Sequence, residues 1–533
     1  MEVNMKIIFK QFSAELDDLR CHNNSFRQSL NRLEHGSAST PRTWFYETKS
    51  PEWILETLQN RLDGMKDLRN IADWDLGKSP KFAYQGRSAP LVDRLDLLDE
   101  YFEHLSSPLL IKDPIWKKAK LEAIRRLKFN ESGSPYTSEQ VVARGLKENK
   151  LNTSSGFPLW RKRNSGEAIA EAIADESIAI KKRFPYVLGV RASMGKIGTE
   201  ARSIFMAPMA LNVHGQRFLY PVQDYIRSLN MDFFAPWEGW DEQQTLISNL
   251  WTTDVLKFGT DYSKMDQHFN KYHAAEVYDV VKHFFSKKWW NELEQSIQYI
   301  FVAPIITNLG LIDQEHSMPS GSEWTNFLET VWDYIQTIYL ELKYHLKFRM
   351  RSGIGDDQLL LVEGITTKRG RQWLLDTIIE VFEAGGTPGN KDKQEEGFND
   401  TTFLQRYLSN DWRGYDGQHR ATGVYSLIRN ATSQVFPEFY HNEDAWGWEQ
   451  FALRAIQIGE NTWGHPEFHW YVSEFMARAN ENILRFVRQT DSKIREDVKN
   501  SRKIANFLPT YNQAKIDKPI FEYEVFKLLR EIA

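Results

Sequence analysis

The segment RSGIGDDQLLLVE, residues 351–363, places two adjacent carboxylates, Asp356 and Asp357, between two strand-like runs. Gly355 and the two acids suit the tight turn of a hairpin, and the apolar run after them indicates a buried strand. Two like charges held side by side cost free energy unless a cation neutralises them, and hard divalent cations such as Mg²⁺ prefer carboxylate oxygens. Because Gly-Asp-Asp turns also occur on surfaces that bind no metal, a metal site requires a partner carboxylate from another segment.

A candidate partner lies in VLKFGTDYSKMDQHFN, residues 255–270, where a strand-like run ends at Asp261 and Asp266 follows about one helical turn later. If this strand lies beside the hairpin in one antiparallel sheet, Asp261, Asp356 and Asp357 converge and can hold two Mg²⁺ ions roughly 3.5 to 4 Å apart. One ion would lower the pKa of an attacking hydroxyl, and the other would stabilise a pyrophosphate leaving group. The alternative interpretation of the two acids in this segment is an acidic cap on an ordinary helix.

Between these two segments lies HSMPSGSEWTNFLETVWDY, residues 316–334, a Ser-Gly turn followed by an amphipathic helical pattern. Glycine and small hydroxyl residues permit close approach of a nucleic-acid backbone and a sugar. A simple loop that caps a core helix is the alternative interpretation.

Taken in order, the three segments resemble the palm of viral RNA-dependent RNA polymerases. The resemblance places motif A at Asp261 and Asp266, motif B at Ser320, Gly321 and Thr325, and motif C at Gly355, Asp356 and Asp357. Four further segments match the family in the expected order: NTSSGFP (152–158) as motif G, RASMGKIGTEARSIFMAP (191–208) as motif F, EAGGTPGNKDKQ (383–394) as motif D and FLQRYL (403–408) as motif E. In chain length, in the sequence of motif B and in the short hairpin, the chain most resembles the polymerases of picobirnaviruses, which have a segmented double-stranded RNA genome. The partitivirus enzymes are near neighbours.

The resemblance implies an α+β, mostly helical fold, a closed right hand in which fingers, palm and thumb surround the active site and the palm holds a central antiparallel sheet. It implies this division of the chain: 1–90, an amino-terminal extension that bridges fingers and thumb; 91–254, fingers; 255–270, palm with motif A; 271–315, a fingers insertion; 316–410, palm with motifs B to E; 411–533, thumb and carboxyl-terminal segment. Within the extension, the polar stretch 21–43 predicts a loop-rich structure.

The activity that the resemblance implies is RNA-directed RNA polymerisation by two-metal-ion nucleotidyl transfer, with primer-independent initiation, in the replication and transcription of a segmented double-stranded RNA genome. The implied cofactor is a pair of Mg²⁺ ions, or Mn²⁺ in their place, held by Asp261, Asp356 and Asp357. Lys391 is the implied general acid for the departing pyrophosphate, with Lys393 as the alternative. The implied nucleotide-binding residues are Arg191, Lys196, Arg202, Asp266, Ser320, Gly321 and Thr325, and the implied template-binding residues are Ser154, Ser155, Gly156 and Pro158.

One position departs from the family pattern. Many members carry an Asn four residues after the motif B threonine, where this chain has Glu329, and Asn326 is only one position past Thr325. In the family, that Asn pairs with the second motif A aspartate to read the ribose 2′-hydroxyl. The resemblance alone therefore does not say how this chain distinguishes ribonucleotides, and Asp266 is the best single candidate.

The formal net charge is −5, but the charges are unevenly distributed along the chain. Between Ile111 and Arg202 there are 19 Lys plus Arg and 10 Asp plus Glu, a balance of +9, so the rest of the chain sums to −14. A basic stretch within an acidic chain predicts one region that grips phosphate. Solvated helix faces are the alternative for any single run, such as KKAKLEAIRRLK at 117–128.

The amino-acid composition limits the cellular compartments in which we expect this protein. The single cysteine, Cys21, excludes an internal disulfide framework and fits a reducing compartment, and no stretch approaches the roughly 18 apolar residues that a membrane span needs. With the resemblance, we expect the virion interior and the host cell cytoplasm as locations. The expected partners are a single-stranded RNA template, its double-stranded product, ribonucleoside triphosphates and the interior of the viral capsid, with no membrane.

Three other classes of protein share part of this pattern but fit it less well than an RNA-dependent RNA polymerase. A reverse transcriptase shares the palm but is expected to carry an aromatic residue before the Asp pair, where this chain has Ile354 and Gly355. A palm-derived scaffold without activity predicts loss of a metal-binding acid, and a metal-dependent nuclease has no reason to carry the Lys and Arg motifs in this order. Near the carboxyl terminus, Trp446, Trp463 and Trp470 indicate either a stacking platform for a first nucleotide or a hydrophobic thumb core.

Overall fold

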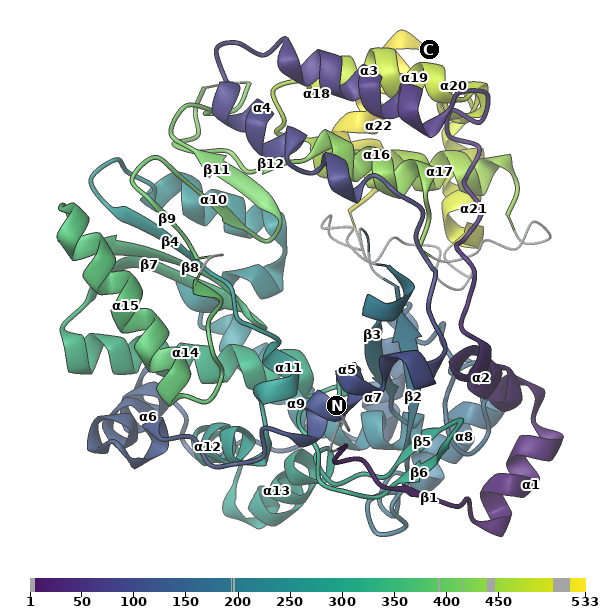
Figure 1. The fold of residues 1–533 in the computed structure, drawn as a ribbon, viewed down its shortest axis with the longest axis vertical. Coiled ribbons are helices and arrows are strands. Elements are labelled where there is room, and N and C mark those ends of the chain that lie inside the picture. Colours follow the sequence, from purple (N-terminus) through teal and green to yellow (C-terminus); the bar gives the residue numbers. More distant parts are fainter. Residues whose placement is uncertain are drawn as a thin grey trace.

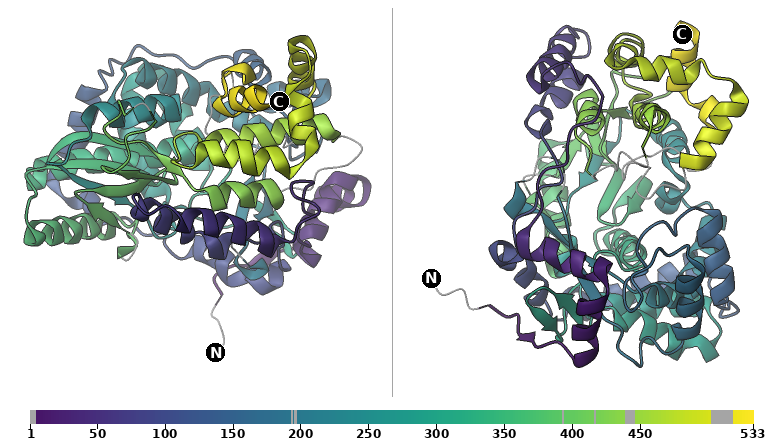
Figure 2. Two further views of the ribbon diagram at one scale, coloured as in Figure 1. Left: turned by 90° about the horizontal axis from the view of Figure 1, so that it is seen from above. Right: turned by 90° about the vertical axis from the view of Figure 1, so that its right-hand side faces the viewer.

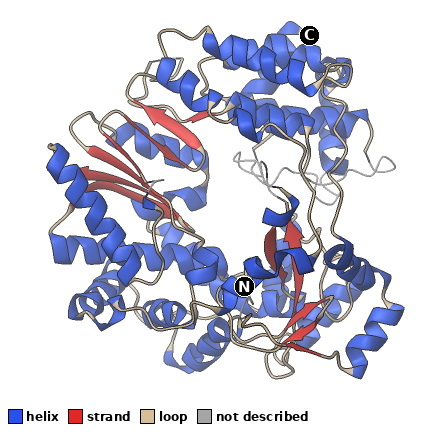
Figure 3. Cartoon of the chain, viewed as in Figure 1, coloured by secondary structure: helices blue, strands red, loops and turns tan. Residues whose placement is uncertain are grey.

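The computed structural model describes residues 5–192, 194, 197–391, 394–415, 417–438, 446–501 and 518–533. Helices dominate the described residues, whose strands gather in three separate sheets (Figure 3). Figure 1 shows the elements arranged as three groups around a common centre, with the palm sheet on one side, a second sheet with its helices opposite, and the carboxyl-terminal helices above them. The mostly helical right hand expected from the sequence is confirmed. Among the described residues, no helix combines the length and the apolar character needed to cross a membrane.

The palm sheet has four antiparallel strands in the order β7-β8-β4-β9. Their bounds are β4 Leu256–Thr260, β7 Lys347–Ile354, β8 Asp357–Glu363 and β9 Glu395–Gly397. β8 begins at the second aspartate of the pair, and its apolar side chains alternate between two cores. Leu360 and Val362 pack with the helices on one face, whereas Leu359 and Leu361 pack on the other face.

The first palm core is covered by α6 Pro114–Arg126, α12 Lys271–Val281, α14 Thr325–Tyr344 and α15 Lys368–Ala384. The second contains residues of α10 Trp240–Leu250 and of the strands β10 Asp400–Phe403 and β11 Arg406–Ser409, which pair with β12 Val424–Tyr425 in a separate sheet. The helices α6 and α10 both lie in the 91–254 range that the sequence assigned to the fingers. They pack on the palm because their apolar faces are buried there.

The fingers contain a five-stranded mixed sheet in the order β1-β6-β5-β2-β3. Its strands are β1 Phe9–Lys10, β2 Tyr186–Arg191, β3 Arg202–Met206, β5 Ile305–Thr307 and β6 Gly310–Ile312, and β2 runs parallel to β5. Helices of the same region are α5 Leu95–Asp99, α7 Ser138–Lys147, α8 Gly166–Asp175, α9 Met209–Ser228 and α13 Trp290–Tyr299. Residues 271–315 therefore contribute two strands to a sheet whose other strands come from the first part of the chain.

The amino-terminal segment touches two distant parts of the molecule, as the purple ribbon in Figures 1 and 2 shows. Helices α1 Ala14–His22 and α2 Asn24–His35 lie beside the fingers sheet, whereas α3 Pro51–Asp63 and α4 Arg69–Leu76 pack on α16 Leu427–Val435 of the thumb. The prediction of a loop-rich stretch at 21–43 is wrong for α2. Its Phe26, Leu30 and Leu33 have helical spacing and are all buried, which outweighs the polar composition.

The thumb is a helical layer built from α16, α17 Trp448–Gly459, α18 Phe468–Trp470, α19 Ala477–Ala479, α20 Glu481–Val487, α21 Asp491–Ser501 and α22 Glu524–Ile532. Of the three tryptophans expected to form either a core or a platform, Trp446 is buried, Trp470 is partly buried against the thumb core, and Trp463 is 42% exposed. Trp463 stacks on Tyr415 with ring centroids 5.8 Å apart.

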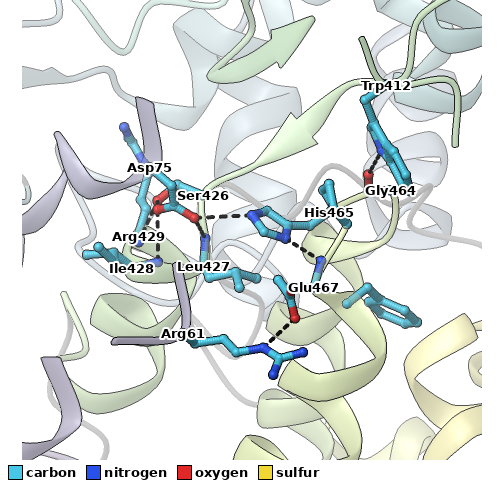
Figure 4. Close-up of polar contacts among 12 residues, drawn as sticks. Arg61, Asp75, Trp412, Ser426, Leu427, Ile428, Arg429, Gly464, His465 and Glu467 are labelled. Atoms are coloured by element: carbon cyan, nitrogen blue, oxygen red, sulfur yellow. Dashed lines mark hydrogen bonds and ion pairs between the residues drawn. The ribbon is translucent and has the colours of Figure 1, made fainter. Parts of the chain in front are cut away.

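Asp75 of α4 anchors the amino-terminal segment at the start of α16 (Figure 4). Its fully buried carboxylate accepts hydrogen bonds from the Ser426 hydroxyl and from the backbone N–H groups of Leu427 and Ile428, at 2.7 and 3.3 Å for the last two. His465 Nε2 lies 3.3 Å from Asp75 Oδ2. A negative charge at a helix amino terminus is favourable, so this contact fixes α4 to the thumb. Because Ser426 donates to the aspartate and not to the histidine, the trio is a structural cap and not a hydrolytic triad.

Candidate active site on the palm sheet

The three candidate metal-binding aspartates lie at one end of the palm sheet. β4 pairs antiparallel with β8, with Thr260 opposite Gln358, so Asp261 follows the end of one strand where the other begins. In the hairpin, Ile354 faces Asp357 across a two-residue turn made of Gly355 and Asp356. Gly355 has a φ of +58°, a value that glycine adopts at no steric cost and that this turn type requires. The strand pairing expected from the sequence is confirmed.

The electrostatics of this end of the sheet are those of crowded anions. Partial desolvation by surrounding protein atoms, followed by the charge of Asp356 and then that of Asp261, raises the pKa of Asp357. Asp356 lies exposed at the tip of the turn. Desolvation, followed by the charges of Asp266 and Asp261, nevertheless raises the pKa of Asp356 as well. Neighbouring carboxylates that raise the pKa of Asp356 and Asp357 in this way fit a hard divalent cation, because such an ion removes the repulsion.

The three aspartates are more widely spaced than the atoms of a closed metal site. Among the described residues, Glu176, His214 and Glu292 are the one group whose ligand atoms all lie within 4.8 Å of one another. A guanidinium already neutralises that group, since Arg217 Nη1 lies 2.6 Å from Glu176 Oε1 and 2.9 Å from Glu292 Oε1. We therefore interpret it as an ion-pair network that joins elements of the fingers.

Asp266 lies in the short helix α11, Met265–His268, and bonds to the Ser-Gly turn of the third segment. Its carboxylate accepts a hydrogen bond from the Ser320 hydroxyl. Burial raises the pKa of Asp266, and hydrogen bonds from Ser320 and Glu329 and the charge of Arg202 oppose that rise. Motifs A and B thus meet at a hydrogen-bonded pair beside the aspartate turn.

The Ser-Gly turn rests on strand β3. The Phe205 N–H donates to the Ser320 carbonyl at 2.8 Å, and a Cβ on Gly321 would lie 2.4 Å from the Phe205 carbonyl oxygen. Gly321 also has a φ of +113°, so only glycine fits there. Thr325 begins α14, and its hydroxyl donates to the Pro319 carbonyl at 3.3 Å. These contacts shape the turn from both sides.

Of the basic candidates, Arg202 influences the aspartates through its charge. It is exposed at the start of β3, and its charge lowers the pKa of both Asp266 and Asp356. Arg191 lies opposite it in the β2–β3 register but donates to Glu438, with Nε 2.6 Å from Oε1 and Nη2 3.2 Å from Oε2. This pair links the fingers sheet to the segment that follows α16. Lys196 lies outside the described residues.

The residues beside Lys391 in the chain, and not the Lys391 side chain, make the contacts that hold its loop near motif A. The Asn390 N–H donates to the Asp261 carbonyl at 2.9 Å, and Gln394 Nε2 donates to the same carbonyl at 2.6 Å. The Lys391 ammonium instead pairs with Asp376 of α15 at 3.0 Å. The loop is therefore in the expected place, with its side chain turned to α15. Lys393, the alternative, lies outside the described residues.

The candidate template residues differ in accessibility. Ser154 is exposed, and Gly156 and Pro158 lie in the same loop. Ser155 is fully buried, and its hydroxyl accepts from the Arg161 N–H at 3.2 Å, so its side chain is out of reach of a template. The structure therefore does not support a template contact by the Ser155 side chain, because the Ser155 hydroxyl stabilises the loop itself.

Arg163 ties the template loop to motif B, a connection that sequence reasoning missed. Its Nε donates to the Ser154 carbonyl at 2.9 Å, and its Nη2 donates to Asn212 Oδ1 at 2.7 Å. Asn212 Nδ2 in turn donates to Glu323 Oε2 at 2.9 Å. Burial raises the pKa of Glu323 to about 7. No local pattern marks this chain of contacts, since its members come from three separate segments.

Two buried acids behind the aspartate turn were also missed as a pair. Glu329 and Asp333 lie one helical turn apart on α14, and both are buried, at 5% and 0% exposure. Burial, followed by the charges of Asp266 and Asp356, raises the pKa of Glu329 well above its usual range. Tyr262 donates to Asp333 Oδ1 at 2.6 Å. The sequence does contain a pattern that could have revealed this pair, because two acids with i, i+4 spacing in an apolar helix are unusual.

An antiparallel palm sheet that carries motifs A and C, with motif B beside it and helical fingers and thumb around it, defines a right-hand nucleic-acid polymerase. The sequence profile of the family described as viral RNA-dependent RNA polymerase matches residues 124–429, more than half of the chain. The chain belongs to this family and is an RNA-directed RNA polymerase.

Individual relatives point to the same group of viruses. The chain is 24% identical over 467 residues to the potential RNA-dependent RNA polymerase of Human picobirnavirus (strain Human/Thailand/Hy005102/-), with 83% of each chain covered. It shares its fold with the crystal structure of the RNA-dependent RNA polymerase of a human picobirnavirus, with a TM-score of 0.79, 20% identity, and coverage of 98% of this chain and 100% of that one. An insertion loop deletion mutant of that polymerase matches equally well.

Proposed function

We propose that this polymerase synthesises RNA by two-metal-ion nucleotidyl transfer, with Asp261, Asp356 and Asp357 as the ligands of two Mg²⁺ ions or of Mn²⁺ in their place. The observation that carries the proposal is the antiparallel pairing of β4 with β8, which brings the three carboxylates to one end of the sheet. When bound, the ions would supply the charge that activates the attacking hydroxyl and stabilises the pyrophosphate.

The residues around the aspartates have complementary tasks in this proposal. Arg202 neutralises the triphosphate, because it is exposed and its charge already lowers the pKa of Asp266 and Asp356. Asp266 and Ser320 receive the sugar, and Gly321 and Thr325 shape the turn that lets it approach. Lys391 protonates the leaving pyrophosphate once its pair with Asp376 opens. Ser154, Gly156 and Pro158 guide the template strand.

The biological role in this proposal is replication and transcription of a segmented double-stranded RNA genome, with synthesis started without a primer. Support comes from the likeness to picobirnavirus polymerases. The expected places of action are the virion interior and the host cell cytoplasm, with the inner face of the capsid as a partner.

A primer-free assay tests the proposal. Purified protein is incubated with single-stranded RNA that has a blocked 3′ end, the four ribonucleoside triphosphates and Mg²⁺, and full-length product is measured. We expect product with Mg²⁺ or Mn²⁺, and none after chelation or with Asp356→Asn. A parent protein that extends only primed templates would refute primer-independent initiation while keeping polymerase activity, and synthesis that persists after chelation would refute the metal mechanism.

A further inference from the structure

Tyr262 directly follows the candidate metal ligand Asp261, but its side chain belongs to the palm core. It is 5% exposed, and its ring stacks on Phe382 of α15 with the ring centroids 4.3 Å apart. A tyrosine hydroxyl at such a depth needs hydrogen-bond partners, because burying a polar group without one is costly. The partners of this hydroxyl therefore show which segments Tyr262 joins.

The Tyr262 hydroxyl contacts three buried polar side chains. It donates to Asp333 Oδ1 at 2.6 Å and lies 2.8 Å from Gln336 Oε1, and both of these residues belong to α14. Gln358 Nε2 of β8 donates to the hydroxyl oxygen at 3.1 Å. None of the three partners is more than 2% exposed. Because water does not reach this cluster, solvent cannot replace a contact that is lost.

The contact with Gln358 joins the two segments that carry the candidate metal ligands. Gln358 directly follows Asp357, just as Tyr262 directly follows Asp261. The last residue pair of the β4–β8 ladder is Thr260 with Gln358, so Tyr262 lies two residues beyond the backbone pairing. At this point the hydroxyl and the amide connect the two segments through their side chains.

The backbone at Tyr262 is held from a further direction by the loop that leads to Lys391. Tyr262 forms an isolated antiparallel bridge with Gly389, and the Ser263 N–H donates to the Pro388 carbonyl at 2.8 Å. The loop thus fixes the main chain of this residue, while α14 and β8 fix its side chain. The carboxylate of the preceding Asp261 is therefore attached to a well-anchored stretch of chain.

We propose that Tyr262 is a positioning residue for the candidate metal site. Its hydroxyl, acting through Gln358, fixes the spacing between Asp261 and the aspartate turn, and thereby sets the affinity of the carboxylates for divalent cations. The inference rests on the proposed two-metal function. Residues that orient metal ligands without touching the metal typically change metal affinity or activity by about 10- to 100-fold when they are removed. Tyr262 acts through its neighbours and is not itself a ligand.

Three substitutions separate this role from general packing. Tyr262→Phe keeps the ring and its stacking on Phe382 but removes the hydroxyl. Gln358→Met has similar length but no donor, and leaves the contact between Tyr262 and Asp333 in place. Tyr334→Phe is the matched control, because Tyr334 is a fully buried tyrosine of α14 whose hydroxyl has no hydrogen-bond partner within the described part of the chain.

The test measures Mn²⁺ binding to the nucleotide-free protein by electron paramagnetic resonance of the free ion, so that the readout does not require activity. Tyr262→Phe and Gln358→Met should each weaken binding by at least about tenfold, whereas Tyr334→Phe should stay within about twofold of the parent. The double variant of Tyr262 and Gln358 should bind within about threefold of the weaker single variant, because both changes break the same contact.

Activity provides a second readout. The Mn²⁺ concentration that gives half-maximal single-nucleotide incorporation should shift by the same factor as binding, while the KM for the nucleotide at saturating Mn²⁺ should stay within about threefold of the parent. Thermal unfolding without cations shows whether each variant is folded at the temperature of measurement. If Tyr262→Phe does not fold, Gln358→Met carries the test.

The proposal is overturned if the folded variants Tyr262→Phe and Gln358→Met bind Mn²⁺ as tightly as the parent. It is also overturned if Tyr334→Phe weakens binding as much as they do, since the effect would then be a general loosening of the core. Asp356→Asn separates these results from a failure of the proposed function. A parent protein that binds no Mn²⁺, or an Asp356→Asn variant that binds it like the parent, would contradict the metal site itself.

Discussion

The Nζ atom of Lys391 lies 3.0 Å from Oδ1 of Asp376 on α15, and both side chains are more than half exposed. An exposed ion pair contributes at most about 1 kcal/mol, so a bound triphosphate can draw the ammonium away from α15. The backbone beside Lys391 is already tied to Asp261. The proposed proton-donor role therefore requires the Lys391–Asp376 pair to open when a nucleotide binds.

Lys391→Arg tests the proton-donor role. Arginine keeps the charge but hardly ever releases a proton, so the maximal rate of single-nucleotide incorporation should fall by roughly 100- to 10,000-fold while nucleotide binding changes little. Pre-steady-state quench-flow kinetics separate the two quantities. Asp376→Asn, which removes only the resting partner, is the control and should keep the parental rate within a fewfold. An unchanged maximal rate for Lys391→Arg would make this lysine an ordinary surface charge.

Asp261→Asn and Asp356→Asn should each lower nucleotidyl transfer by several orders of magnitude, because each removes a metal ligand and its charge. Asp357→Asn should be milder, since the second acid of the turn usually lies further from the ions in this family. Without divalent cations, the unfolding midpoint of these variants should equal or exceed that of the parent, because the mutual repulsion is relieved. Activity within tenfold of the parent would reject the ligand assignment.

RNA affinity should depend strongly on salt, although the whole chain is acidic. Each phosphate contact to a single strand changes the slope of log K against log salt by about −0.7. Arg202→Gln should raise the KM for nucleotides, because this arginine is exposed and its charge lowers the pKa of Asp266 and Asp356. Arg125→Gln is the control, since Arg125 is an exposed base in the same basic stretch that pairs with Glu122 on its own helix. A flat salt dependence would argue against a phosphate-binding channel.

Gly321→Ala should weaken nucleotide binding without unfolding the protein. A Cβ there would meet the Phe205 carbonyl at 2.4 Å, and a φ of +113° strains any other residue. We expect the turn of the free variant to shift and relieve this strain, so that restoring the turn on nucleotide binding costs up to about 1 to 3 kcal/mol, or up to about 5- to 150-fold in a binding constant. Titration with a nucleotide and steady-state kinetics measure the effect. Gly166→Ala, at a helical position with nothing within 4 Å, should behave like the parent.

Asp75→Ala should destabilise the thumb. It would leave the Ser426 hydroxyl and two backbone N–H groups buried without their acceptor, and each such group costs about 1 to 3 kcal/mol in the free energy of unfolding. Asp73→Ala on the same helix removes only an exposed pair with Arg69 and should cost less than about 1 kcal/mol. Thermal unfolding of both variants checks the difference. Equal midpoints would show that α4 is not anchored through Asp75.

Prediction from sequence succeeded where a local pattern carries the information. The alternating and apolar runs around Asp356 and Asp261 specify strands, and the glycine before the Asp pair specifies a tight hairpin, so the palm sheet could be expected with its acids at one end. It failed at α2, where three buried apolar residues with helical spacing outweighed a polar composition. It could not foresee that Ser155 is buried, since burial depends on what packs over a loop.

The amino-acid pattern alone was sufficient to identify the polymerase motifs and their order, because each motif is a short run whose residue types are constrained by chemistry. Contacts between distant segments are different, since they depend on which elements the fold brings together. Asp266 gains its partner Ser320 only when the Ser-Gly turn reaches α11, and Arg191 meets Glu438 only when the segment after α16 reaches the fingers sheet. A buried acid and a surface arginine look alike in a sequence whatever they face. Their partners, and therefore their charge states and tasks, follow from the three-dimensional packing.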